Sequence, residues 1–214
     1  MKIKNILWDN DGVLVDTEKY FYKANQDLCI RYGFDFSMED FRALILEKAV
    51  GPWDRFIDSG FDENQILSLR ESRDKIYSDY IEKDDITING VQKVLKYLFK
   101  KYSMAIVTSS RRIHFEAIHK KTGFLKYFDF SLSIEDYPQC KPSKDPYVAA
   151  LKKMGADISE TIVIEDSKRG LTSAVAAGLK CIVIPTELTI NQDFSEAFKV
   201  LSSIEDVPDF LEGL

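Results

Sequence analysis

Residues 3–18 have the sequence IKNILWDNDGVLVDTE, and this stretch decides the fold. An apolar run at residues 6–8 ends abruptly at Asp9, which is followed by Asp11 and Gly12. Such a pattern is typical of a buried strand that carries carboxylates at its C-terminal end. Asp9 and Asp11 are two positions apart, so on a continuing strand their side chains lie on the same face. Gly12 then allows a sharp turn.

A pair of carboxylates at one strand end suits chemistry that needs a nucleophile and a proton carrier. One carboxylate attacks an electrophile while the other moves a proton. Two like charges at this separation repel each other unless a cation neutralises them. Mg²⁺ is the usual cation, because it binds carboxylate and backbone oxygens and keeps positions for water and phosphate. An Asp-rich loop without chemistry is the alternative, and this stretch alone leaves it open.

Length and composition limit the possible classes of protein. A chain of 214 residues can bury a full core and form one domain, or one domain with an insertion. Its 45% hydrophobic and 30% charged residues are ordinary for a globular protein. The net charge of −6 comes without a long basic block, which argues against nucleic acid and against an anionic membrane as partners. No apolar stretch approaches the roughly 18 residues of a membrane span.

The cysteines indicate a reducing compartment. Cys29, Cys140 and Cys181 are far apart, form no CxxC pattern and leave an odd number. We expect reduced thiols in a cytoplasmic protein. The apolar run near the N-terminus is interrupted by Asp9, so it does not resemble a secretion signal.

We also expect the protein to act as a monomer or a weak dimer.

A long helical segment follows the first strand. Between residues 17 and 85 apolar residues recur at spacings of three and four, as at Tyr20 and Ala24. An all-helical insert placed directly after two carboxylates predicts a cap that excludes water and selects substrate. A helical subdomain without a gating role is the alternative. The predicted division is a core of residues 1–16 and 86–214 with a cap of residues 17–85.

Short apolar strands alternate with helices in the rest of the chain. We predict strands at residues 104–107, 128–132, 161–164 and 181–184, and a tail after residue 193 that packs as helix and turn. This alternation predicts an α/β fold, a Rossmann-like, mostly parallel sheet of about five strands flanked by helices. In such sheets ligands bind at the carboxyl ends of the strands, near a topological switch point.

Polar residues follow these strands as well. Thr108 and Ser109 stand between a strand and a helix, where backbone N–H groups favour an anion, although Ser and Thr are also ordinary helix caps. Lys141 precedes a proline, which restricts its backbone and aims its side chain. Glu165 and Asp166 end a further strand. We expect all of them to meet Asp9 and Asp11 at one edge of the sheet.

Four segments resemble, in order and spacing, the four motifs of the haloacid dehalogenase superfamily. They are DNDGVLVDTE (9–18), VTSS (107–110), CKPSKDPYVAAL (140–151) and VIEDSKRGLTSAVAAG (163–178). The most similar members are the helical-cap group of phosphoglycolate phosphatases and β-phosphoglucomutases. The resemblance extends over residues 2–185, but in the cap it is limited to position and helicity. It implies a Mg²⁺-dependent phosphatase that acts on a small phosphorylated metabolite.

The resemblance also implies a role for each motif residue. Asp9 is implied as the nucleophile that forms an aspartyl-phosphate, and Asp11 as the group that protonates the leaving oxygen and then activates water. The implied phosphate-binding residues are Thr108, Ser109 and Lys141. The implied Mg²⁺ ligands are Asp9, Asp11 through its carbonyl group, Asp166 and Glu165.

Two alternatives stay open. The first is a β-phosphoglucomutase-like isomerase, although Phe21 stands where the mutases carry a cap histidine. The second is a non-catalytic module that binds a phosphorylated ligand. Dehalogenation itself is disfavoured because it lacks the second carboxylate, which is present here as Asp11. His114 and His119, the only histidines, are expected at the surface or partly packed, without a catalytic role.

Overall fold

A computed structural model describes residues 2–214, and the chain divides into two compact units. One unit combines the residues up to Asp16 with Ile86–Leu214, and the other consists of Thr17–Asp85. The first unit holds all the strands, and the second is helical. Within residues 2–214 no helix is both long and apolar enough to cross a membrane.

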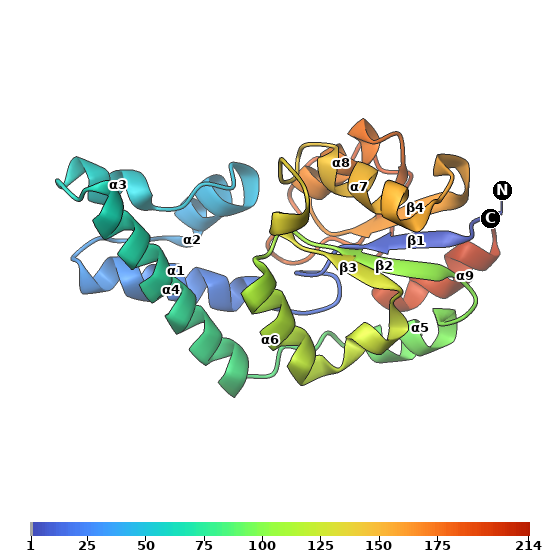
Figure 1. Ribbon diagram of the computed structural model, residues 1–214, viewed down its shortest axis with the longest axis horizontal. Coiled ribbons are helices and arrows are strands. Elements are labelled where there is room, and N and C mark those ends of the chain that lie inside the picture. The colour runs from blue at the N-terminus through green and yellow to red at the C-terminus, as the bar shows by residue number, and fades with distance from the viewer. Residues whose placement is uncertain (1) are drawn as a thin grey trace. The chain divides into compact units, whose positions relative to one another are not determined.

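The first unit is built on a six-stranded parallel sheet with the order β3-β2-β1-β4-β5-β6 (Figure 1). The strands are β1 (Asn5–Trp8), β2 (Ser103–Val107), β3 (Phe130–Leu132), β4 (Thr161–Glu165), β5 (Lys180–Val183) and β6 (Lys199–Val200). This is the strand order of a doubly wound fold, in which β1 and β4 flank the topological switch point. The expected α/β fold is therefore confirmed.

Two details of the sheet differ from the sequence expectation. The strand expected at residues 128–132 is shorter, Phe130–Leu132, and the side chain of Asp129 just before it accepts a hydrogen bond from the N–H of Met104. A sixth strand, β6, lies in the tail that was expected to form only helix and turn. Its two residues are both exposed, so no buried apolar run announces it.

Helices cover both faces of the sheet (Figure 1). The bounds are α5 (Val91–Leu98), α6 (Arg112–Thr122), α7 (Asp145–Met154), α8 (Lys168–Ala176) and α9 (Val207–Glu212), with short 3-10 turns at Phe124–Tyr127, Ile134–Asp136, Ile158–Glu160 and Ile204–Asp206. One core cluster joins α5, α6 and α9 to Ile6 and Trp8 of β1. The other joins α7 and α8 to Leu7. Because successive side chains of β1 enter opposite clusters, β1 is buried on both faces.

The second unit is all helical. It contains α1 (Glu18–Arg31), α2 (Met38–Asp40), a π-helical segment (Phe41–Glu47), α3 (Trp53–Asp58) and α4 (Glu63–Lys83). Helix α1 packs along α4, and aromatic pairs line their contact. Tyr20 stacks on Tyr80 with ring centroids 6.0 Å apart, and Phe21 meets Tyr77 edge to face at 5.3 Å. The helical periodicity expected for residues 17–85 is thus realised as an apolar contact within this unit.

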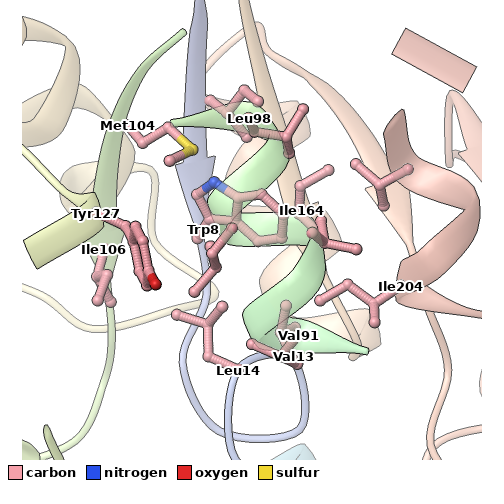
Figure 2. Packing of buried hydrophobic residues seen from close by; sticks show 14 of the residues in the cluster. Trp8, Val13, Leu14, Val91, Leu98, Met104, Ile106, Tyr127, Ile164 and Ile204 are labelled. Carbon is pink, nitrogen blue, oxygen red and sulfur yellow. The ribbon is translucent and has the colours of Figure 1, made fainter. Parts of the chain in front are cut away.

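Trp8 is the largest side chain fully buried in the first unit, and we expect Trp8→Ala to lower the free energy of unfolding by about 3–5 kcal/mol. Figure 2 shows its ring against α5, among Leu98, Met104 and Ile164. Urea denaturation followed by circular dichroism measures the change. Val148→Ala, at a half-exposed position on α7, is the control and should change stability by less than about 1 kcal/mol. Equal effects of the two substitutions would contradict this packing.

Candidate active site

The carboxyl ends of β1, β2 and β4 meet at one edge of the sheet. Trp8, the last residue of β1, is in register with Ile106 of β2 and Ile164 of β4. Asp9 therefore emerges between the ends of the two neighbouring strands. Thr108 follows β2, and Asp166 follows β4. The strand order thus brings three motifs together that are far apart in the sequence.

Lys141 lies at the centre of this edge and is buried, with 3% of its surface exposed. Its ammonium group donates to Asp9 Oδ1 at 2.5 Å, to Glu165 Oε1 at 2.7 Å and to the carbonyl oxygen of Val107 at 2.8 Å. An ammonium has three N–H donors, and here each has an acceptor. Lys141 therefore connects the ends of β1, β2 and β4.

Glu165 is enclosed by protein donors. Its Oε1 also accepts from the Tyr147 hydroxyl at 2.6 Å, and its Oε2 accepts from the Asp166 N–H and the Ser167 hydroxyl, both at 3.3 Å. Gly170 lies against the carboxylate so closely that a Cβ there would overlap all of its atoms. The absence of a side chain at Gly170 is what lets Glu165 reach Lys141.

The Asp11 carboxylate is held by three neutral donors. Its Oδ2 accepts from the Ser110 hydroxyl at 2.6 Å, the Asn10 amide at 3.2 Å and the Thr108 hydroxyl at 3.3 Å. Ser110 was not among the residues predicted from the sequence. Its place in the VTSS segment, two residues after Thr108, was the sequence feature that could have indicated a site residue. A third hydroxyl in such a run is, however, more often a helix cap.

The second hydroxyl of that segment belongs to Ser109, which follows Thr108 directly after β2. The carbonyl oxygen of Thr108 accepts a hydrogen bond from the Tyr137 hydroxyl at 2.6 Å. This bond holds the backbone at the peptide group that joins Thr108 to Ser109. All seven residues singled out from the sequence therefore lie on segments that end at this edge.

Burial and charge act against each other on Asp9 and Lys141. Burial raises the pKa of Asp9 to about 7, with help from the charge of Glu165, while Lys141 opposes the change. Burial alone would lower the pKa of Lys141, but Asp9 and Glu165 outweigh it and raise that pKa above its usual value. Lys141 is therefore charged at neutral pH. Its single charge is not enough to bring the pKa of Asp9 down to that of an ordinary carboxyl group.

The acidic residues at this edge fit a hard cation. Asp9, Glu165 and Asp166 are all buried, and each offers a carboxylate oxygen within 4.8 Å of the others. Carboxylate oxygens are the ligands that Mg²⁺ prefers. Gly12 adopts a φ of +82° beside Asp166, and a Cβ there would strike the carboxylate. The chain therefore leaves room around the Asp166 oxygens, as a bound cation requires.

The expectation for the two histidines is wrong in one respect. Both are buried, with 7% of His114 and 2% of His119 exposed. His119 Nε2 lies 2.8 Å from Asn10 Oδ1. The ring therefore contacts the residue that stands between the two aspartates of the first motif. Burial lowers the pKa of His119 to about 4, although the charge of Asp11 opposes this shift.

Fold and site together define a doubly wound α/β enzyme in which a buried lysine donates to two carboxylates at the switch point of the sheet. Residues 6–184 match the family described as haloacid dehalogenase-like hydrolase. The chain belongs to this family, and the resemblance found in its four motifs is confirmed. It is accordingly an enzyme with a hydrolase fold.

Individual proteins show the same similarity over nearly the whole chain. The chain is 29% identical over 211 residues to the protein CbbY of Rhodobacter capsulatus. This alignment covers 92% of the chain and 92% of that protein. It is 24% identical over 212 residues to the pyrophosphatase PpaX of Bacillus mycoides, which covers 99% of the chain and 96% of that protein. A crystal structure of a CbbY variant from Rhodobacter sphaeroides with xylulose-(1,5)bisphosphate superposes with a TM-score of 0.82 at 23% identity, over 95% of this chain and 96% of that one.

We expect Gly170→Ala to displace Glu165 and to lower the free energy of unfolding by about 1–3 kcal/mol, because the new Cβ overlaps a buried carboxylate. Urea denaturation measures the loss. Gly213→Ala is the matched control, since its φ is −83° and a Cβ there meets only ordinary contacts. If the two substitutions change stability equally, Glu165 is not confined by Gly170.

Proposed function

We propose that this enzyme is a Mg²⁺-dependent phosphatase that hydrolyses a small phosphomonoester through an aspartyl-phosphate on Asp9. The observation that carries the proposal is the hydrogen bond from Lys141 to Asp9, beside an Asp11 carboxylate that accepts from the Ser110 hydroxyl. The phosphatase assignment also agrees with relatives such as the pyrophosphatase PpaX. As substrate we propose a phosphorylated metabolite, the class of ligand bound in the CbbY variant.

In the first step an oxygen of Asp9 attacks phosphorus, and the bond between phosphorus and the ester oxygen breaks. Asp11 gives its proton to the leaving oxygen, so an alcohol departs and Asp9 carries the phosphoryl group. In the second step Asp11 removes a proton from water, and the resulting hydroxide attacks the same phosphorus. Phosphate leaves, and Asp9 is restored as a carboxylate.

The other motif residues stabilise the charge of the transferring group. Lys141, the Thr108 hydroxyl and the Ser109 backbone N–H are proposed to donate to the phosphoryl oxygens. Lys141 gives all three of its protons to protein acceptors in this structure, so it must share one of them with the substrate. Asp9, Asp166 and the Asp11 carbonyl would hold Mg²⁺, with Glu165 beside them. When bound, the metal supplies positive charge next to the phosphoryl oxygens.

We propose that the helical unit, Thr17–Asp85, is a cap that selects the substrate. Phe21 of this unit packs edge to face on Tyr77 and lies under the Arg73 guanidinium. An apolar, packed side chain carries no proton to a sugar hydroxyl, so this position favours hydrolysis over a phosphomutase reaction. Free thiols at Cys29, Cys140 and Cys181 support a cytoplasmic enzyme. We further propose that it acts as a monomer or a weak dimer.

Asp9→Asn should reduce phosphate release by at least about 10³-fold, because a carboxamide is a poor nucleophile and does not form the aspartyl-phosphate. The assay measures phosphate released from p-nitrophenyl phosphate and from a panel of phosphorylated metabolites. Asp209→Asn makes the same change of charge at an exposed position on α9 and should leave the rate unchanged. Equal activity of wild type and Asp9→Asn, or inactivity of both over the whole panel, would overturn the proposal.

Removal of divalent cations with EDTA should abolish hydrolysis, and added Mg²⁺ should restore it, because three buried acids share the site with one lysine. Circular dichroism before and after EDTA separates loss of the cation from loss of the fold. Full activity of the EDTA-treated enzyme would contradict the metal assignment while leaving the role of Asp9 to the test above.

A further inference from the structure

A chain of hydrogen-bonded side chains leads from α6 to the Asp11 carboxylate. His119 Nε2 lies 2.8 Å from Asn10 Oδ1, and Asn10 Nδ2 lies 3.2 Å from Asp11 Oδ2. On the far side of the ring, His119 Nδ1 lies 3.1 Å from the Thr122 hydroxyl. Asn10 is fully buried and His119 nearly so. The function proposed above assigns no role to either side chain.

The direction of every hydrogen bond in this chain follows from its end at Asp11. An ionised carboxylate only accepts, so the Asn10 amide must present its N–H to Asp11 and its carbonyl oxygen to His119. His119 must then donate from Nε2. A neutral imidazole has a single N–H, which leaves Nδ1 to accept from the Thr122 hydroxyl. The ring stays neutral at pH 7, since burial lowers the pKa of His119 to about 4.

A purely structural role does not explain these residues well. A buried amide and a buried imidazole stabilise a fold only when their polar atoms are paired, and an apolar pair of the same shape would fill the space without that requirement. Asn10 stands between the two aspartates of the motif, so its side chain is placed to act on one of them. Ser110 and Thr108 hold the same Asp11 oxygen from the end of β2. Asn10 adds a third hydrogen bond to this oxygen and is itself bonded to His119 of α6.

We infer that His119 is a positioning residue that, through Asn10, orients the Asp11 carboxyl group toward the leaving-group oxygen. The inference rests on the proposed function, in which Asp11 protonates that oxygen. As Asp11 gives up its proton, negative charge develops on the carboxyl group. The Asn10 N–H stabilises this charge, and the donor from His119 polarises the amide. Because the charge develops in the transition state, the benefit falls on the rate of the chemical step more than on substrate binding.

The test compares two esters of similar shape, p-nitrophenyl phosphate and phenyl phosphate. The p-nitrophenolate ion leaves without a proton, whereas phenolate leaves far more readily once it is protonated. The ratio kcat/KM reports the first irreversible step, which is transfer to Asp9. We expect His119→Phe to lower kcat/KM for phenyl phosphate about tenfold, the effect of one lost hydrogen bond, and to lower it less than about threefold for p-nitrophenyl phosphate.

Two variants separate positioning from packing. His119→Gln keeps an N–H donor near the place of Nε2 and should restore kcat/KM for phenyl phosphate to within about threefold of wild type. Ile118→Val changes packing at the neighbouring, fully buried position on α6 and should leave the ratio between the two esters unchanged. Equal losses for both esters in His119→Phe, without rescue by His119→Gln, would overturn the inference and leave the phosphatase proposal intact. Inactivity of wild type toward all phosphate esters would instead overturn the proposed function.

A second measurement tests the chain of hydrogen bonds without any assay of activity. The sequence contains only two histidines, so long-range ¹H–¹⁵N correlation spectra of wild type and His119→Gln identify the ring of His119 by difference. We expect a neutral ring with its proton on Nε2 at pH 7. A proton on Nδ1 alone would overturn the inference, because Nε2 would then have to accept from the Asn10 amide, which could no longer present its N–H to Asp11.

Discussion

The active site depends on the hydrogen bonds that the buried ammonium group of Lys141 donates. It donates to Asp9 after β1, to the Val107 carbonyl at the end of β2 and to Glu165 at the end of β4. A charge this deeply buried is stable only when it is paired and fully hydrogen-bonded. Both conditions are met here, since three acceptors at the ends of three strands surround three donors. The geometry of the reactive edge is therefore a consequence of the strand order, which places β1 between β2 and β4.

The same contacts favour the proposed second cation at this edge. Asp9, Glu165 and Asp166 bring three carboxylates into one buried cluster, and Lys141 supplies one positive charge in return. Burial raises the pKa of Asp9 to about 7, and the charge of Glu165 adds to this effect while Lys141 opposes it. Asp9, the proposed nucleophile, must be ionised to attack. Divalent charge next to Asp9 and Asp166 would favour its ionised form, as a second opposite charge does for any buried carboxyl group.

Local patterns in the sequence predicted the parts of the structure that depend on buried strands. The apolar runs that end in Asp9, Thr108 and Glu165 are strands in the structure, and their polar ends share one edge. The exposed strand β6 has no such run, so it could not be predicted. The burial of His119 depends on tertiary packing. A signal was nevertheless present, because His119 follows Phe115 by four positions on α6 and shares its apolar face. A histidine on an apolar face is usually a packed residue, and only the contact with Asn10 distinguishes this one.

The two aspartates of the first motif differ in their partners, and the difference suits the two tasks proposed for them. Asp9 is bound by a cationic donor, which favours the ionised form that a nucleophile needs. Oδ2 of Asp11 accepts from an amide and two hydroxyl groups. A hydroxyl group donates to a carboxylate and accepts from a carboxylic acid, so these partners serve both protonation states. A group that must give a proton in one step and take one in the next requires such an environment. The cationic donor on Asp9 and the hydroxyl donors on Asp11 thus fit the proposed division of these carboxylates into nucleophile and proton carrier.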